Sequence, residues 1–326
     1  MNYLAVNIEI TFPESRGRAG KLLKSASSFT VDSSWQNLTD TASVVMAKRL
    51  YLEKDKRVFE LLKAGDPVII RGGYNGQYFD EFKGFITEVL DDLPVMIKCE
   101  DNMYVLKRTK CHCSYNGVKL EKLLKDILPP QFKVNAMDVE LGTVLFKDYT
   151  VSQALQDLKD KMGIYSYFVG DTLVSGKIYF DNPETQKVKY VFTRNVIDND
   201  LRYRRKEDMR LKVTMTSFLS KGKKLKVTVG DDDGQEQKLV CTHVSSESEL
   251  KKLAQKELDR LKIDGYQGTL TTYALPFVRH GYTAQVVNFD NPDRDGYYYV
   301  DGVTTTVNTS GAYRRTVKLG PRAANG

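Results

Sequence analysis

Apolar and polar residues alternate along much of this chain, most regularly towards its two ends. Leu4, Val6, Ile8 and Ile10 take every second position of the first segment. Because neighbouring side chains of a strand point to opposite faces, this period of two predicts a β-strand buried on one side. The pattern returns in residues 65–101, where two strands joined by a glycine-rich turn and then a third strand form a predicted meander.

Three other segments place apolar residues at the spacing of a helix. They are residues 117–130, 150–163 and 246–265, and each ends at a proline or a glycine. Thr150 is a suitable N-cap for the second helix, and Gly163 is a suitable stop. A hairpin is expected around Gly170 and Asp171. Residues 102–195 are therefore predicted to form a small α+β module.

The predicted meander has a counterpart near the C-terminus. Residues 82–89 (FKGFITEV) match residues 300–307 (VDGVTTTV) in the pattern apolar, x, Gly, apolar, x, Thr, x, Val. The strand before each match begins at a glycine, Gly65 or Gly281, and each match contains a glycine, Gly84 or Gly302. A glycine inside a strand often marks a bulge or a close approach of two backbones. We expect these glycines to shape two β-modules of similar design.

The fold class predicted from these patterns is α+β, mainly β, with two similar antiparallel β-barrels flanking the α+β module. The length of 326 residues is more than one compact core usually holds. Three domains are expected: a first barrel over residues 1–101, the module over 102–195, and a second barrel with one long helix over 196–326. Trp35, the single tryptophan, lies in a turn-like segment, where a large aromatic ring usually anchors a loop on a core.

The net charge of +7 is distributed unevenly along the chain. Basic residues gather in residues 16–24, 202–206 and 221–224, whereas residues 231–236 are mainly acidic. Most such runs are solvated faces, but they can also contact phosphate groups or an acidic partner surface. The candidates for a channel lining or an interface are Arg16, Arg18, Lys21, Lys24, Arg202, Arg204, Arg205 and Lys206. We expect neither a membrane span nor a signal peptide, since no long apolar run occurs.

Residues suited to catalysis or metal binding are few and scattered. Cys111, His112 and Cys113 suggest a zinc cluster, but on a strand His112 would face away from both cysteines. The same spacing returns at residues 241–243, and the acidic residues of 290–296 lack the spacing of a calcium-binding loop. No nucleophile-elbow, zincin or phosphate-loop motif occurs. We therefore expect no enzymatic activity, no cofactor and no bound metal.

An ordered set of segments resembles one known family. The segments are SWQNLTDTASVVM, AGDPVIIRGGYNG, FKGFITEV, IKCEDNMYVLKR and TVSQALQDLKDKMGI, followed by GYQGTLTTYALPFVRHGYTAQVVNFDNPDRDGYYYVDGV and GAYRRTVKLG. Together they resemble the baseplate hub proteins of contractile-tailed phages, the Mu-like tail hub and late-control-D family, and the hub part of type VI secretion VgrG proteins. The resemblance covers nearly the whole chain and rests on strands and glycines, with no catalytic signature.

This resemblance implies a structural protein of the tail baseplate, made in the bacterial host cytoplasm and located in a virion or a phage-like particle. Hubs of this family are homotrimers in which each chain contributes two tube-type barrels, so three chains present six similar barrels around a channel. Such a ring can dock under a six-fold tail tube or tube-initiator ring and receive a three-fold spike. The tape-measure protein or DNA is a further candidate partner in the channel.

Two other functions stay open at this point. Barrels of the oligonucleotide-binding type would bind single-stranded nucleic acid, with Tyr297, Tyr298 and Tyr299 as stacking platforms. Consecutive tyrosines on a strand are, however, more often half core and half surface. A cell-wall hydrolase is the remoter alternative; it would need two carboxylates across a cleft, and the sequence alone does not rank the acidic pairs.

Overall fold

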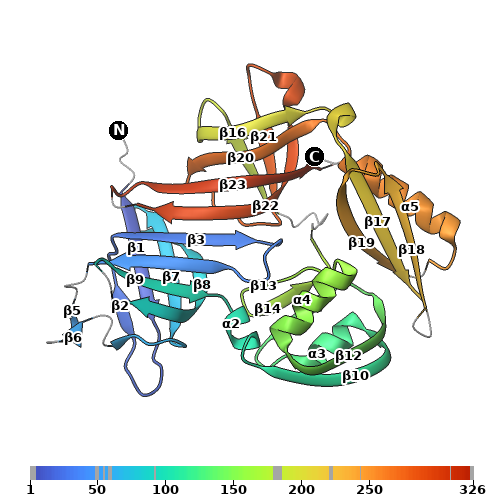
Figure 1. The fold of residues 1–326 in the computed structure, drawn as a ribbon. Helices are drawn as coiled ribbons and strands as arrows, with labels where there is room; N and C mark the ends of the chain where they lie inside the picture. The colour runs from blue at the N-terminus through green and yellow to red at the C-terminus, as the bar shows by residue number, and fades with distance from the viewer. Residues whose placement is uncertain are drawn as a thin grey trace.

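The computed structural model describes residues 5–47, 51–53, 56–57, 61–91, 93–178, 186–219, 223–242, 244–308 and 310–323. Most of its elements are strands, and the largest sheet contains 13 of them. Figure 1 shows this sheet beside two smaller units, each of which combines strands with helices. The expectation of a mainly β protein with antiparallel sheets is confirmed.

The large sheet takes strands from both ends of the chain. From the N-terminal part come β1 (Val6–Phe12), β2 (Lys21–Leu23), β3 (Ser28–Ser34), β4 (Thr41–Met46), β7 (Pro67–Tyr74), β8 (Gln77–Leu90) and β9 (Val95–Glu100). From the C-terminal part come β15 (Lys187–Val191), β16 (Val196–Arg204), β20 (Gly265–Tyr273), β21 (Thr283–Val287), β22 (Gly296–Val307) and β23 (Tyr313–Arg322). The strand order is β16-β20-β23-β22-β3-β4-β9-β8-β7-β1-β2, and β21 and β15 branch from β22.

The pairings of the described strands form an open path, and they close neither half into a barrel. The two-barrel arrangement therefore stays a prediction. The core of the first half is built mainly from the apolar faces of β1, β3, β4, β7, β8 and β9, and the core of the second half from β15 and β20 to β23. The two cores meet where β3 pairs with β22.

Five neighbouring strands of the first half have counterparts in the second half. The order β3-β4-β9-β8-β7 is repeated as β16-β20-β23-β22-β21, and every neighbouring pair in both sets is antiparallel. The register agrees as well: Pro67 pairs with Phe85 between β7 and β8, and Thr283 pairs with Tyr299 between β21 and β22. The two sets of strands are thus an internal repeat of structure.

The irregular positions of the two meanders define which residues correspond. The register between β8 and β9 shifts between Ile86 and Glu88, and the register between β22 and β23 shifts between Val300 and Gly302. Both shifts are of the kind that a β-bulge produces, and they fall at the same point of the repeat. Ile86 therefore corresponds to Val300, and Glu88 corresponds to Gly302.

The sequence match was right about the repetition and wrong about its register. It set Ile86 against Thr304, four residues beyond Val300, and it set Gly84 against Gly302. Because side chains of a strand alternate with a period of two, a shift of four residues leaves every side chain on the same face. The apolar pattern alone could not distinguish the two registers.

Gly65 and Gly281 do occupy corresponding positions. The Gly65 amide donates to the carbonyl of Ile86 over 2.7 Å, and the Gly281 amide donates to the carbonyl of Val300 over 2.8 Å. Their φ angles are +87° and +84°, in the left-handed region that glycine adopts without a steric penalty. The repeat thus begins at the same backbone conformation in both halves.

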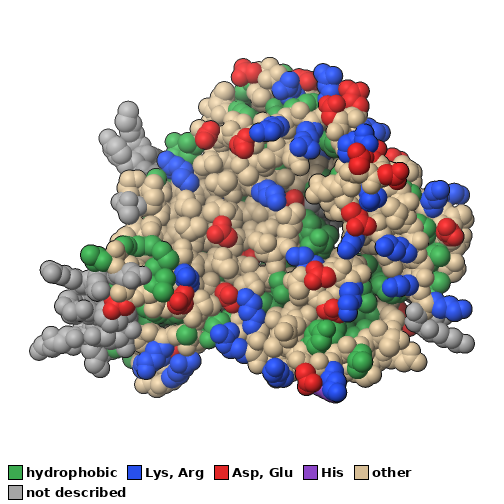
Figure 2. All heavy atoms as spheres, in the orientation of Figure 1, with side chains coloured by type: hydrophobic (Ala, Val, Ile, Leu, Met, Phe, Trp, Pro, Cys, Tyr) green, Lys and Arg blue, Asp and Glu red, His purple; other side chains and the backbone are tan. Residues whose placement is uncertain are grey.

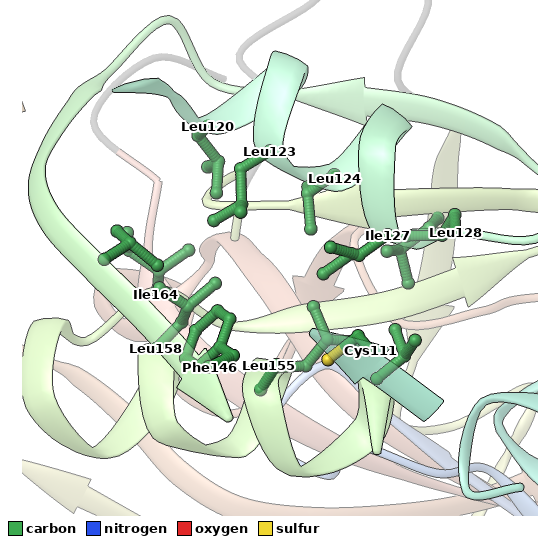
Figure 3. Close-up of a cluster of buried hydrophobic side chains, with 14 of the residues drawn as sticks. Cys111, Leu120, Leu123, Leu124, Ile127, Leu128, Phe146, Leu155, Leu158 and Ile164 are labelled. Carbon is green, nitrogen blue, oxygen red and sulfur yellow. The ribbon is translucent and has the colours of Figure 1, made fainter. Parts of the chain in front are cut away.

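The predicted α+β module has its own core. Its elements are α2 (Met103–Leu106), β10 (Lys110–Lys119), α3 (Leu120–Ile127), β11 (Lys133–Ala136), β12 (Glu140–Thr150), α4 (Val151–Met162), β13 (Ser166–Val169) and β14 (Thr172–Ser175). Figure 3 shows Leu124 of α3, Leu155 of α4 and Phe146 of β12 among the buried side chains of this core. The expected hairpin around Gly170 is formed by β13 and β14.

Helix α4 begins and ends where the sequence predicts. The Thr150 hydroxyl accepts from the Gln153 amide over 3.2 Å, the Gln153 side chain accepts from the Thr150 amide over 2.7 Å, and Gly163 follows with φ +70°. This reciprocal pair of bonds is a capping box, which satisfies two amides that the first turn leaves without partners.

We expect Thr150→Ala to destabilise α4 locally by about 1 kcal/mol, because the first turn loses its cap. The measurement is hydrogen exchange of the α4 amides, which should become faster in the variant. Thr143→Ala, at an exposed position of β12, is the matched control and should leave the exchange of α4 unchanged. Equal exchange in α4 of the Thr150 variant and the natural chain would contradict the role of the cap.

A second small unit lies within the segment predicted as the second barrel. It contains η1 (Lys206–Asp208), β17 (Leu211–Phe218), β18 (Lys224–Gly230), β19 (Gln235–Thr242) and α5 (Glu247–Leu261), and its three strands form a separate sheet. α5 packs Leu250, Ala254 and Leu258 on that sheet. The remaining short elements are the β5 (Tyr51–Glu53) and β6 (Lys56–Arg57) pair and η3 (Pro292–Arg294). The three-domain division stays a prediction. β15 belongs to the large sheet, although it lies within residues 102–195, the range predicted for the α+β module.

Candidate functional site

The feature that organises this molecule is the junction between the two halves of the large sheet. β3 and β22 are antiparallel neighbours from Ser34 opposite Gly302 to Phe29 opposite Val307. Figure 1 shows the two strands side by side in the middle of the sheet. Segments more than 260 residues apart in sequence therefore share one backbone ladder.

Polar side chains fix the register at this junction. Trp35 Nε1 donates to the Asp301 carboxylate over 3.0 Å, and the Ser34 hydroxyl donates to the Asp301 carbonyl over 2.9 Å. Further along, the Thr304 hydroxyl donates to Asp32 over 2.6 Å. A slip of one residue would break all of these bonds and turn the apolar face of β3 towards solvent.

Trp35 connects the junction to the α+β module. Its side chain is buried and packs with Tyr167 and Val174 of the β13–β14 hairpin. Its ring meets the Tyr165 ring edge-on, with 4.9 Å between the ring centroids. The indole is amphipathic, so it fills an apolar pocket while its N–H satisfies Asp301. One side chain thus contacts the first half, the second half and the module.

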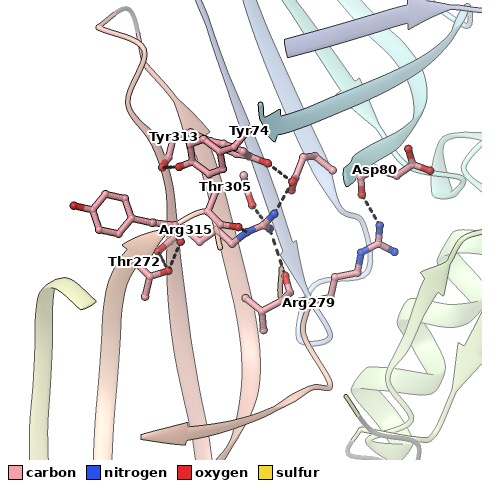
Figure 4. A network of polar contacts seen from close by, with 11 residues as sticks. Tyr74, Asp80, Thr272, Arg279, Thr305, Tyr313 and Arg315 are labelled. Atoms are coloured by element: carbon pink, nitrogen blue, oxygen red, sulfur yellow. Dashed lines mark hydrogen bonds and ion pairs between the residues drawn. The ribbon is translucent and has the colours of Figure 1, made fainter. Parts of the chain in front are cut away.

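A buried ion pair lies next to the junction, and the sequence analysis did not identify it. The Arg315 guanidinium on β23 and the Glu81 carboxylate on β8 are 2.5 Å apart, with side chains 1% and 2% exposed. Arg315 also donates to the Ala274 carbonyl over 2.9 Å and to the Thr305 hydroxyl over 3.0 Å. Figure 4 shows these bonds converging from several strands. A buried charge is tolerated only when it is paired and hydrogen-bonded, as it is here.

Tyr313 belongs to the same network. Its hydroxyl donates to Glu81, while the Tyr74 hydroxyl donates to the Tyr313 carbonyl over 3.0 Å. Burial and the neighbouring Glu81 charge raise the pKa of Tyr313, so its hydroxyl stays protonated and remains a donor. Glu81 is thereby bound to two residues of β23, and the two halves of the sheet are joined by charge as well as by backbone.

A cavity of about 510 Å³ lies beside the junction, and Asp40 and Asp101 are two of the four acidic residues that line it. Asp101 is buried and Asp40 is half-buried, and the Asp40 amide donates to the Asp101 carboxylate over 3.3 Å. Desolvation raises the pKa of Asp40 to about 6 despite the hydroxyl of Ser33, and desolvation with the Asp40 charge raises the pKa of Asp101. His280 also lines the cavity, and burial lowers its pKa to about 4.

These shifts predict how stability depends on pH. A carboxyl group whose pKa is raised by folding holds its proton more tightly in the folded chain, so Asp40 should lower the free energy of unfolding as the pH rises from 3.8 towards about 6. His280 acts in the opposite direction, because its lowered pKa favours the folded state as the pH rises from about 4 to 6.5.

The measurement is denaturant unfolding at several pH values, followed by the fluorescence of Trp35, the single tryptophan. Asp40→Asn should make the decrease above pH 3.8 smaller, leaving the part that Asp101 contributes, and His280→Gln should remove the opposing increase. An unchanged pH profile in Asp40→Asn would show that the Asp40 carboxyl is not perturbed in the folded chain.

The glycines selected from sequence occupy different environments. A Cβ atom on Gly84 would lie 2.1 Å from the Glu100 carbonyl oxygen, so β8 and the end of β9 approach closely there. At Gly302 the nearest atom, the Ser33 carbonyl oxygen, would be 3.2 Å away. Gly84 is therefore the residue that a close backbone approach requires, whereas Gly302 lies at the bulge position of β22.

The predicted basic residues separate into two groups. Arg18 pairs with Asp66 at 2.5 Å and Arg16 lies 4.0 Å from the same carboxylate, while Lys21 begins β2 and Lys24 follows it with its side chain exposed. Arg202 and Arg204 are exposed on β16, and the exposed Arg205 and Lys206 follow them. Figure 2 shows one face of the molecule, on which basic and acidic side chains are interspersed. Lys221 of the third basic run lies outside the described residues.

The residues of the candidate metal and nucleic-acid sites also have defined positions in the structure. Cys111 and Cys113 lie on β10, and no three His, Cys, Asp or Glu side chains in the described part of the chain are grouped to hold a metal ion. His243 lies outside that part. Tyr298 and Tyr299 are 0% and 4% exposed, which leaves them unavailable as stacking platforms for bases. No helix of the described residues is long and apolar enough to span a membrane.

Comparison with known proteins adds information on the fold. No family model and no curated protein matches the sequence. Among solved structures, a tail protein of Neisseria meningitidis MC58 is similar, with 16% identity, a TM-score of 0.63, and coverage of 98% of this chain and 97% of that one. The 43 kDa tail protein of prophage MuSo2 from Shewanella oneidensis has 15% identity, a TM-score of 0.64, and coverage of 97% and 98%. This chain has the fold of phage tail proteins.

A third similar structure comes from a secretion system. It is an Escherichia coli protein described as a component of the type VI secretion system with structural similarity to phage T4 tail proteins. The identity is 11% and the TM-score 0.55, over 91% of this chain and 73% of that one. The expected relation to phage tail proteins and type VI secretion proteins is thus supported at the level of fold.

Proposed function

We propose that this protein is a non-enzymatic hub of a contractile phage tail or phage-like injection particle. Three copies would form a ring with a central channel, and the ring would adapt a six-fold tail tube or tube-initiator ring to a three-fold spike. Its location would be the tail baseplate, and a tape-measure protein or DNA would pass through the channel.

The observation that carries this proposal is the internal repeat of five strands within a fold shared with tail proteins over nearly the whole chain. A chain with two equivalent units can satisfy two symmetries at once. Three copies present six similar units, which match a six-fold ring, while the complete chains keep a three-fold arrangement. Closed cyclic symmetry would also limit the size of the assembly.

The test is the mass of the purified protein at increasing concentration, together with electron-microscope images. We expect a species of three times 37.1 kDa and ring-shaped particles with a central hole. A stable monomer at high concentration with no rings in the images would contradict the proposal. Salt-sensitive binding of single-stranded DNA by such a monomer would favour the nucleic-acid alternative.

A further inference from the structure

Among the described residues, two strand edges lack a neighbour that their counterparts in the repeat possess. β3 is paired on both sides, with β4 and with β22. Its counterpart β16 is paired on one side, with β20, and no described strand lies along its other edge. Residues 199–204 of β16 are the positions that correspond to residues 29–34 of β3.

The second of these strand edges is at the end of β8. On β22, the pairing with β21 stops at Tyr299, and residues 302–307 pair with β3 along the same edge. On β8, the pairing with β7 ends at Phe85, so the edge from Glu88 to Leu90 has β9 on one side and no described strand on the other. Within the described residues, β8 therefore lacks the neighbour that β3 provides to β22, and β16 lacks the neighbour that β22 provides to β3.

We propose that β16 of one copy pairs with the end of β8 of a second copy, in the antiparallel register that β3 and β22 use within the chain. This places Glu88 opposite Arg204, Val89 opposite Tyr203 and Leu90 opposite Arg202. The partner is a second copy of this chain, and the inference rests on the proposed ring because it names the contact that would build it.

The charges of the two edges fit this pairing. Glu88 and Arg204 are both exposed, and directly opposed charges of opposite sign stabilise a strand pair. Lys98 Nζ also lies 2.9 Å from the Glu88 carboxylate, and one carboxylate can accept hydrogen bonds from both Lys98 and Arg204. The corresponding residues of the internal junction, Gly302 and Ser34, are uncharged. The ion pair would therefore distinguish the contact between copies from the contact within a chain.

The apolar faces fit the same register. Val89 packs against the core of the first half, and Tyr203 and Leu201 pack against the core of the second half. In the internal junction the matching position is Val303, which is buried in the second core. A register displaced by one residue would set charged side chains against these cores, so the faces select the proposed alignment.

The geometry of the contact makes it head-to-tail. Each copy offers one β16 edge and one β8 edge, which are different surfaces, so copies add in one direction and close into a ring if the rotation allows. Around such a ring, the junction inside a chain would alternate with the same junction between chains. Pairing would also cover two strand edges that otherwise invite uncontrolled association.

The first experiment is cysteine cross-linking between copies. Glu88→Cys and Arg204→Cys chains are mixed and oxidised, and a covalent dimer is expected on a non-reducing gel. The double variant should give a covalent ladder that ends at the size of the assembled particle. Mixing Glu88→Cys with Lys226→Cys, an exposed site on β18, is the matched control and should give no dimer above the level of the natural chain, which carries four cysteines.

The second experiment reverses charges. Glu88→Arg or Arg204→Glu should each raise the concentration at which half the protein is assembled, by roughly fivefold, and the combined exchange should restore it. Lys226→Glu should have no effect. If the natural chain forms rings but the cross-link is absent and the reversals change nothing, the pairing is overturned while the proposed function stands. If the natural chain stays monomeric, or the double variant links only within one chain, the pairing is also overturned.

Discussion

Replacing Arg315 with alanine is expected to lower the free energy of unfolding by about 3–5 kcal/mol. The change would leave the Glu81 carboxylate buried without its guanidinium partner, next to the junction of the two halves. Removing one member of a buried pair costs far more than removing a surface ion pair, because the remaining charge cannot regain its hydration. Denaturant unfolding followed by Trp35 fluorescence measures the loss, since Trp35 contacts both halves.

Two further variants separate the buried charge from general disruption of β23. Lys318→Ala, at an exposed position of the same strand, should change stability by less than about 0.5 kcal/mol. Replacing both members of the pair, as in Glu81→Leu with Arg315→Met, should recover most of the stability, since neither charge is then buried alone. A loss below about 1 kcal/mol in Arg315→Ala would show that the pair is hydrated in solution.

Gly84→Ala is expected to destabilise the first half by roughly 3 kcal/mol, the upper part of the usual range for overpacking. The added methyl group would lie 2.1 Å from the Glu100 carbonyl oxygen, and that atom belongs to the backbone of a neighbouring strand. A flexible side chain could move aside, but a paired backbone has to shift with its whole ladder. The readout is again the denaturant midpoint reported by Trp35.

Gly302→Ala is the matched comparison for this prediction. There the nearest contact would be 3.2 Å, which the Ser33 carbonyl and the Ser34 side chain can relieve by small movements. Its loss of stability should be less than half of that caused by Gly84→Ala. Equal losses would mean that the two glycines serve the same role, as the sequence match suggested, and would contradict the register derived from strand pairing.

Local patterns in the sequence predicted local structure well. The spacing of apolar residues and the capping residues located α4 between Thr150 and Gly163, because both signals act within one or two turns of the chain. The alternating segments became strands, with β8 and β22 among the longest. Both predictions depend on interactions between residues that are close in sequence.

The Arg315–Glu81 pair is a feature that such local patterns did not predict. The two residues are separated by 234 positions, and a charged residue on an alternating strand is usually assigned to the solvent face. One signal was present: Arg315 shares its side of β23 with Tyr313 and Val317, which are buried. An arginine within an inward-facing series indicates a buried charge that needs a partner, but not which partner.

The sequence by itself determined the mainly β character of this protein, the helices α3, α4 and α5, and the presence of a repeated unit. Those features follow from periodicity and from glycine and capping residues, which act over short distances along the chain. Only the tertiary structure decided the register of the repeat, the joining of β3 to β22, and the two edges along which no described strand lies. The reason is that a period of two is unchanged by an even shift, so the choice among registers is made by contacts between strands that are distant in sequence.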